Sequence, residues 1–142
     1  MTPILGTEDN PLPGQQFEQL QNRGQNEFKG LETFDLPKMV NDVQYNSDEF
    51  TAVCPITGQP DMYQVEIDLI GSDLGIESKS LKLYLGTYRN KGAFCEALAE
   101  QILVDVLNAV STDAGPEQAG VAVVQKRRGG IGIQANARWF RG

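Results

Sequence analysis

Histidine is absent from this 142-residue chain, and cysteine occurs only twice, at Cys54 and Cys95. Without histidine, a His-ligated metal centre and a His-based catalytic triad are both excluded. The two cysteines are too few for a disulfide-stapled scaffold and are not spaced like a zinc-binding pair. We therefore expect no metal site, and any cysteine chemistry must involve one of these two thiols.

Long apolar runs are also missing. No segment is long enough to span a bilayer, and the first residues lack the basic and apolar regions of a secretion signal, so we expect a cytoplasmic protein without a membrane partner. The hydrophobic fraction of 40% and the charged fraction of 22% are typical of globular proteins. A chain of this length forms one core of ordinary size, which predicts a single domain.

Positive charge is scarce in the first half of the chain. Residues 1–70 contain three Lys/Arg and twelve Asp/Glu, whereas residues 71–142 contain nine and seven, and the net charge is −7. This acidic balance argues against a nucleic-acid partner, because phosphate backbones are bound by clustered positive charge. The cations of the second half are still sufficient to bind one phosphorylated small molecule.

The apolar pattern predicts two strands, two helices and two strands, in that order. The first thirty residues are rich in Gln, Asn, Gly and Pro, so residues 1–34 are expected to form an extended arm and residues 35–142 the domain. Alternating apolar residues predict strands at 38–50 and 62–69, with an irregular loop at 51–61 between them.

The middle of the chain has helical periodicity. Apolar residues at i, i+3, i+4 and i+7 from Leu81 to Tyr88 predict a first helix, and apolar residues at every fourth position predict a second at 93–110. Strands are predicted again at 120–125 and 131–137. This order fits an α+β fold with an antiparallel sheet and helices on one face, and it does not fit parallel βαβ winding.

The segment around Cys54 has the parts of a nucleophilic site. Cys54 lies in a loop with Pro55, Gly58 and Pro60, and Asp61 follows at the start of the next strand. A thiol on a rigid loop with a nearby carboxyl group can act as a nucleophile beside a proton donor. The alternative is that Cys54 is a buried cysteine that acts as a small hydrophobe.

Two lysines near the start of the first helix suggest an anion site. Lys79 and Lys82 are three residues apart, so they share a helix face close to the unpaired amides of the N-terminus. This arrangement suits a phosphate group. The alternative is an ordinary solvated face with two surface lysines.

Two long runs of residues, from Phe50 to Asp61 and from Glu77 to Tyr84, are not generic. They read Phe-Thr-Ala-Val-Cys-Pro-Ile-Thr-Gly-Gln-Pro-Asp and Glu-Ser-Lys-Ser-Leu-Lys-Leu-Tyr. This pair closely resembles the motifs of the NADPH-dependent 7-cyano-7-deazaguanine reductases of queuosine biosynthesis. The resemblance continues through Tyr-Arg-Asn at 88–90 and Arg-Gly-Gly-Ile at 128–131, to about Ile133.

The resemblance implies a tunnelling fold. In that fold, two strands, two helices and two strands form a subunit, and several subunits close a barrel with active sites at their interfaces. We therefore expect a homo-oligomer. The resemblance also implies that Cys54 adds to the nitrile carbon of 7-cyano-7-deazaguanine to form a thioimide, while Asp61 supplies protons.

Further site residues follow from the same resemblance. Lys79, Lys82 and Arg128 match positions that bind the cofactor, NADPH, and no Gly-x-Gly-x-x-Gly turn is available to bind it otherwise. The positions that match substrate-binding residues are Ile76, Glu77, Ser78, Cys95 and Glu96. For Glu96, the alternative is a first-turn carboxylate that only complements the helix dipole.

The chain departs from the family at Cys95, where a histidine is usual. A thiol is a weaker hydrogen-bond donor than imidazole, so proton transfer is expected to rely more on Asp61. Cys95 either fills the space of the imidazole or faces Cys54 closely enough to form a regulatory disulfide. Two other functions stay open: a relative of the amidinotransferases that add ammonia to the nitrile, and a non-catalytic deazapurine-binding protein.

Overall fold

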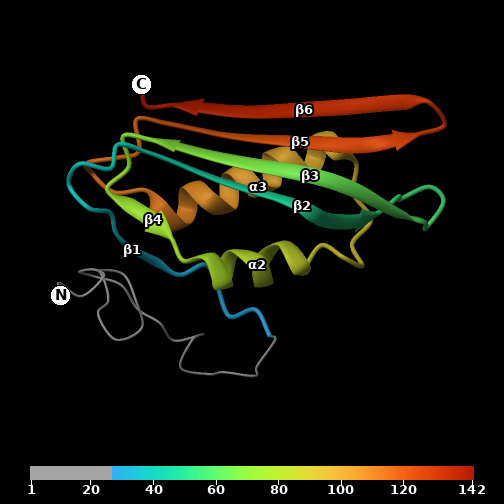
Figure 1. Ribbon diagram of the computed structural model, residues 1–142, viewed down its shortest axis with the longest axis horizontal. Helices are drawn as coiled ribbons and strands as arrows, with labels where there is room; N and C mark the ends of the chain where they lie inside the picture. The colour runs from blue at the N-terminus through green and yellow to red at the C-terminus, as the bar shows by residue number, and fades with distance from the viewer. Residues whose placement is uncertain (1–26) are drawn as a thin grey trace, which may run out of the picture.

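The computed structural model describes residues 27–142, which form a four-stranded antiparallel sheet, a two-stranded sheet and two helices (Figure 1). The main sheet has the strand order β2-β3-β5-β6, and β1 pairs with β4. In chain order the elements are β1 (Thr33–Asp35), β2 (Asp42–Val53), β3 (Pro60–Ile70), β4 (Leu74–Ile76), α2 (Ser78–Gly86), α3 (Cys95–Val110), β5 (Gln118–Arg128) and β6 (Ile131–Phe140).

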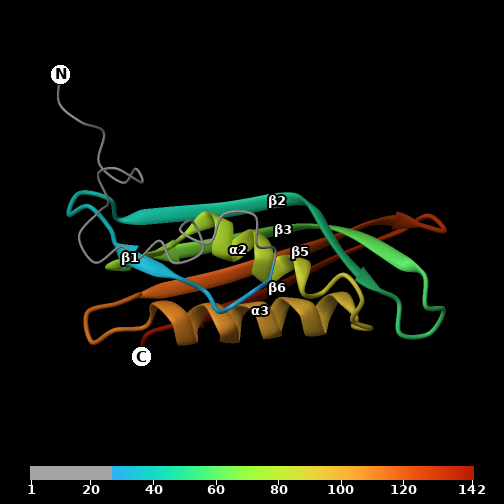
Figure 2. The same ribbon diagram turned by 90° about the horizontal axis from the view of Figure 1, so that it is seen from below.

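Both helices lie on the same side of the main sheet (Figure 2). Helix α3 packs against β5 and β6, and α2 approaches β2. The predicted α+β class, the antiparallel sheet and the order of the long elements are confirmed. Within residues 27–142, no helix is both long enough and apolar enough to cross a membrane.

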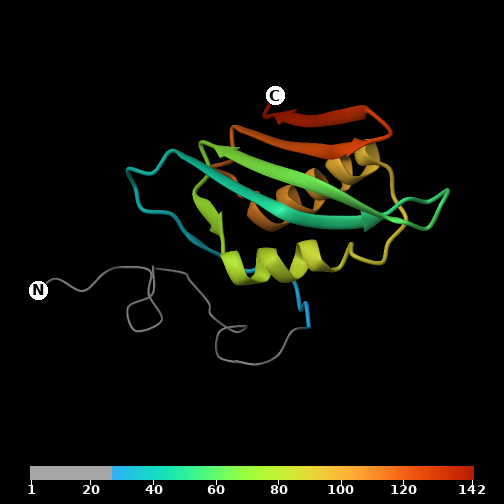
Figure 3. The same cartoon turned by 45° about the vertical axis from the view of Figure 1, so that its right-hand side comes forward.

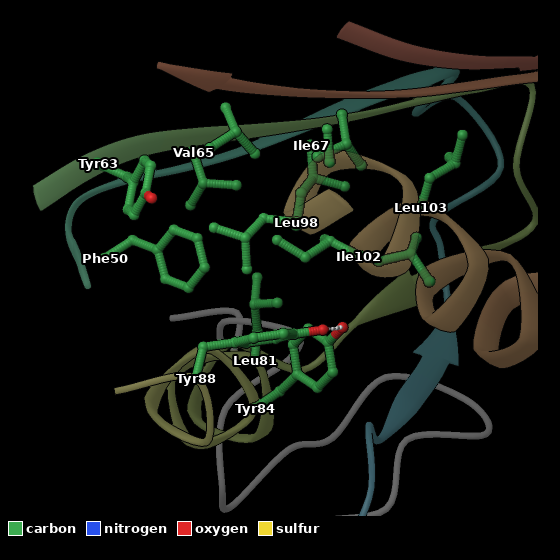
Figure 4. Packing of buried hydrophobic residues seen from close by; sticks show 14 of the residues in the cluster. Phe50, Tyr63, Val65, Ile67, Leu81, Tyr84, Tyr88, Leu98, Ile102 and Leu103 are labelled. Carbon is green, nitrogen blue, oxygen red and sulfur yellow. Dashed lines mark hydrogen bonds between the residues drawn. The ribbon is translucent and has the colours of Figure 1, made fainter. Parts of the chain in front are cut away.

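The core lies between the sheet and the helices because β3 and α3 each direct one apolar face inward. Alternate residues of β3, from Tyr63 to Leu69, are almost fully buried, as the period of two in a strand requires. They face the buried side of α3, which repeats at helical spacing from Leu98 to Val110 (Figure 4).

The loop before β3 is shorter than the predicted loop at 51–61. Strand β2 continues through Val53, and β3 begins at Pro60, so the loop contains only residues 54–59. Ala52 pairs with Asp61 across the two strands, and Ala52 is buried on the core face. The prolines of this segment misled the sequence interpretation, since Pro60 occupies the first position of a strand, where a missing N–H is tolerated.

The predicted boundary between arm and domain, at residues 34 and 35, falls inside β1. Phe28 also contacts Tyr84 of α2, with ring centroids 5.6 Å apart, and Leu31 packs against the core. The chain from residue 28 onwards is therefore packed on the domain. Residues 1–26 lie outside the described residues, and the predicted arm is untested there.

The β1–β4 pair, which the sequence analysis missed, positions the start of α2 (Figure 3). Thr33 pairs with Ile76, and the N–H of Ile76 donates to the Tyr45 hydroxyl at 2.8 Å. The N–H of Glu77 donates to the carbonyl of Glu32 at 2.8 Å. These contacts fix Ile76 and Glu77 immediately before the helix.

Candidate active site

Cys54 occupies a tightly closed loop between β2 and β3. Its N–H donates to the carbonyl of Gln59 at 2.8 Å, and its carbonyl accepts from the N–H of Gly58 at 2.9 Å. Gly58 has φ of 72°, a conformation that favours glycine. The preceding residue, Val53, bonds through its N–H to the carbonyl of Lys91 at 2.9 Å, which ties the loop to the connection between α2 and α3.

The Cys54 thiol is partly exposed, and its surroundings favour the thiolate. The pKa of Cys54 is lowered from its ordinary value first by a hydrogen bond from the Thr57 side chain, then by the backbone N–H groups of Thr57 and Ile56. Partial burial and the charge of Asp61 oppose this shift. Because the thiolate is the nucleophilic form of cysteine, this loop gives Cys54 the character that a nucleophile needs.

Asp61 is buried beside the Cys54 loop and bears an ion pair. Its carboxylate accepts a hydrogen bond from the guanidinium of Arg128 at 2.7 Å, although the two residues are far apart in the chain. The Asp61 side chain is 9% exposed and that of Arg128 is 42% exposed. Arg128, at the end of β5, thus places a positive charge at the edge of the candidate site.

Cys95 has the opposite environment. It begins α3, it is 1% exposed, and its Sγ donates to the carbonyl of Val123 at 3.3 Å. Burial, followed by the charge of Glu96, raises the pKa of Cys95. Both thiols are free. The buried, hydrogen-bonded thiol favours the interpretation in which Cys95 fills space, and the disulfide stays an untested prediction.

The second group of candidate residues surrounds the N-terminus of α2. The carboxylate of Glu77 caps the helix: it accepts from the N–H groups of Lys79 and Ser80, each at 2.7 Å. Glu77 and Ile76 are buried, whereas Ser78 is exposed. Of the three predicted substrate-binding residues 76–78, only Ser78 therefore presents its side chain to a ligand.

An open cavity of about 650 Å³ lies between β2 and α2. Ser78, Lys82 and Arg89 line it on the helix side, and Tyr45 and Phe50 line it on the sheet side. A cavity of this size and mixed lining is typical of small-molecule sites.

Glu96 is exposed in the first turn of α3 and lines a separate cavity of about 600 Å³ between α3 and β6. The structure thus brings Asp61 and Arg128 together beside the Cys54 loop, and Tyr63 lies within electrostatic range of Asp61, Cys54 and Cys95. The α2 residues and Glu96 form two further groups.

The sequence profile of the family described as QueF-like protein matches residues 60–140. The NADPH-dependent 7-cyano-7-deazaguanine reductase of Frankia casuarinae is 41% identical over 113 residues, which cover 80% of this chain and 87% of that protein. The chain belongs to the QueF-like family.

Other QueF-like proteins agree with this assignment. The NADPH-dependent 7-cyano-7-deazaguanine reductase of Bacteroides thetaiotaomicron is 42% identical over 113 residues, which cover 78% of this chain and 72% of that protein. Among solved structures, the archaeosine synthase QueF-Like in the apo form has a TM-score of 0.63 and 24% identity, and covers 71% of this chain and 95% of its own. That likeness concerns the fold alone.

Two residues of this QueF-like site were not found from the sequence. Thr57, whose hydroxyl faces the Cys54 sulfur, was signalled only by its position three residues after the cysteine in a tight loop. Tyr63 is two residues after Asp61 and therefore on the same face of β3, but it looked like an ordinary core residue.

Proposed function

We propose that this QueF-like chain reduces the nitrile of 7-cyano-7-deazaguanine to the amine of 7-aminomethyl-7-deazaguanine, with NADPH as reductant. The supporting observation is a thiol with a lowered pKa, Cys54, close to a buried carboxyl group, Asp61, in a chain 41% identical to a reductase of that name. A nitrile accepts hydride poorly, and covalent capture replaces one difficult step by easier ones.

In the capture step, the Cys54 sulfur forms a bond to the nitrile carbon and one π bond of the nitrile breaks. The nitrogen takes a proton from Asp61, and the product is a thioimide on Cys54. The proton that Asp61 gives to the nitrogen is the one that the Cys54 thiol loses when it ionises, so Asp61 returns to its carboxylate form. Arg128, 2.7 Å from the Asp61 carboxylate, stabilises the charge that remains after the transfer.

The residues around α2 fit a nucleotide cofactor. Lys82 and Arg89 line the same cavity as Ser78, so two cations and a hydroxyl face a space of about 650 Å³. Lys79 lies on the same first turns of α2. In this proposal Lys79, Lys82 and Arg128 bind the phosphates of NADPH. When bound, NADPH supplies the hydride for each of the two reduction steps.

In this proposal the substrate is recognised by Glu96 and by the residues at the N-terminus of α2. The exposed carboxylate of Glu96 can accept two parallel hydrogen bonds from the amino and ring N–H groups of a guanine-like base. Ser78 contacts the substrate through its side chain, whereas the buried Ile76 and Glu77 can contribute backbone groups only. Cys95 is buried and contributes to the packing next to the site.

Assembly into a homo-oligomeric barrel would join these groups. Within residues 27–142, the sheet face opposite the helices is uncovered, and β2 and β6 each have only one neighbouring strand. That face bears polar residues such as Gln44, whose amide donates to Glu66 at 2.6 Å and to Asp68 at 2.8 Å. A polar face and two open edges suit a barrel with a water-filled interior.

Turnover with purified protein tests the proposal. We expect two molecules of NADPH oxidised for each molecule of aminomethyl product, with substrate-dependent loss of NADPH absorbance. Conversion of the nitrile with ammonia, without NADPH oxidation, would replace the reductase by the amidinotransferase alternative. Binding of the deazapurine without any conversion would leave only a binding protein.

Variants of Lys79 and Lys82 can separate NADPH binding from capture of the nitrile by Cys54. Lys79→Ala combined with Lys82→Ala should raise the KM for NADPH at least tenfold and leave thioimide formation nearly unchanged, because different contacts serve the two steps. A matched control, Lys29→Ala combined with Lys38→Ala, removes two exposed lysines outside the motif and should change neither quantity. Equal loss of capture and NADPH affinity in the first variant would contradict the cofactor role.

A further inference from the structure

Tyr63 has a hydroxyl group that the fold does not use. The residue is 0% exposed on β3, and its ring packs on Phe50 with centroids 5.7 Å apart (Figure 4). Among the described residues, its Oη is a buried oxygen that makes no hydrogen bond of ordinary geometry. A buried hydroxyl without a partner destabilises a fold, and phenylalanine would keep the ring contacts without that cost.

The hydroxyl of Tyr63 is surrounded by the reactive groups of the candidate site. Burial is the main cause that raises the pKa of Tyr63, followed by the negative charge of Asp61 and the electrostatic influence of the nearby Cys95 and Cys54 sulfurs. Tyr63 therefore stays protonated and has a hydrogen to donate to the Asp61 carboxylate.

The charged and titratable neighbours come from every packed element. Asp61 shares β3 with Tyr63, Cys54 belongs to the preceding loop, and Cys95 begins α3 with Glu96 beside it. Arg128 of β5 holds the Asp61 carboxylate by one oxygen, Oδ1. Asp61 thus has acceptor capacity left for a second donor.

We propose that Tyr63 is a positioning residue that donates a hydrogen bond to the Asp61 carboxylate when Asp61 has given its proton to the substrate nitrogen. This inference rests on the proposed nitrile reduction. In that step the O–H bond of Asp61 breaks, an N–H bond forms, and the negative charge left on Asp61 is shared between Arg128 and the Tyr63 hydroxyl.

The need for such a donor follows from the composition of this chain. Histidine is absent, and the Cys95 thiol is a weak donor that already donates to the Val123 carbonyl. Among the described residues, Tyr63 is a neutral donor that is still available on the same strand face as Asp61. Catalytic hydrogen bonds are often misaligned before substrate binds and become well aligned in the complex, which accounts for the present geometry.

Tyr63→Phe tests the inference because it removes only the hydroxyl. Without this donor the ionised form of Asp61 is less stabilised, so a reaction that needs protonated Asp61 should continue to higher pH. Proton transfer from Asp61 to the substrate nitrogen also becomes less favourable, and the maximal rate should fall about tenfold. Both quantities come from the pH profile of thioimide formation and of NADPH oxidation.

Tyr88→Phe is the matched control. Tyr88 is also buried and contacts the same Phe50 ring, at 5.6 Å, but its hydroxyl bonds to that of Tyr84. This variant should keep the parental pH profile. The melting temperature of Tyr63→Phe should equal or exceed that of the parent, because an unused buried hydroxyl is lost.

The Asp61→Asn variant tests whether Tyr63 acts through Asp61. In that variant, adding Tyr63→Phe should not slow thioimide formation further. An equal tenfold loss there, an unshifted pH profile, or a Tyr63→Phe protein that fails to fold would each overturn the inference. Failure of the proposed function is a separate result, since the parent protein would then form no adduct and oxidise no NADPH.

Discussion

The two cysteines of this chain have opposite environments. Cys54 is partly exposed in a loop whose Thr57 side chain and backbone N–H groups lower its pKa, and Cys95 is 1% exposed in the core, where burial raises its pKa. The difference indicates that hydrogen-bond donors and exposure, and not the presence of a thiol, favour the thiolate at Cys54 over Cys95.

The largest expected difference between the two thiols concerns catalysis. Cys54→Ala should lower nitrile reduction at least a thousandfold because no covalent capture remains, and it should leave the fold intact because the side chain belongs to a surface loop. Cys95→Ala, the matched control, should retain most of the activity. NADPH oxidation at saturating substrate measures both, and comparable losses in the two variants would remove the distinction.

Alkylation rates compare the reactivity of the Cys54 and Cys95 thiols in the absence of substrate. At neutral pH, iodoacetamide should modify Cys54 at least about a hundredfold faster than Cys95, because only Cys54 combines access with thiolate character. Peptide mass spectrometry over time gives both rates. Similar rates would show that α3 opens readily or that the Cys54 thiolate is not favoured.

A smaller effect is expected from a change at Thr57, whose side chain is the main cause of the lowered pKa of Cys54. Thr57→Val keeps the side-chain shape but removes the hydroxyl that faces the sulfur, so the pKa of Cys54 should rise toward its ordinary value. In the pH profile of thioimide formation, the acid limb should then move to higher pH, and the reaction at neutral pH should be several-fold slower. Thr87→Val, at a hydroxyl that donates to the Tyr84 carbonyl, is the control that should leave this limb in place.

The smallest effect is expected on stability. Cys95→Ala removes a fully buried sulfur and its hydrogen bond to Val123, and should lower the free energy of unfolding by about 1–2 kcal/mol. Cys54→Ala should change it by less than about 0.5 kcal/mol. Urea titration measures both, and the reverse order would contradict the burial that separates the two thiols.

The long elements were predictable because their apolar periods are local. The alternation in β3 and the four-residue repeat in α3 follow directly from which side chains face the core. The three-residue strands β1 and β4 were not predictable, since so short a segment shows no period. Strand β5 also extends to Arg128, because it continues to pair with β6 beyond its apolar part.

The sequence indicates the residues of the candidate site, but it does not indicate how the structure arranges them. Cys54 and Asp61 were recognised from one contiguous motif, whereas the ion pair between Asp61 and Arg128 depends on the pairing of β3 with β5. The unused hydroxyl of Tyr63 depends on packing from several elements, so no local pattern indicates it. Long-range pairing and burial are properties of the fold and not of spacing.

The central claim is that Cys54 captures the nitrile, and peptide mapping of the protein incubated with 7-cyano-7-deazaguanine alone tests it most directly. The account predicts that the Cys54 peptide gains the mass of one substrate molecule with no atoms lost, and that added NADPH discharges this adduct as the aminomethyl product. An adduct found only on Cys95, or product formation with no adduct on Cys54, would contradict it.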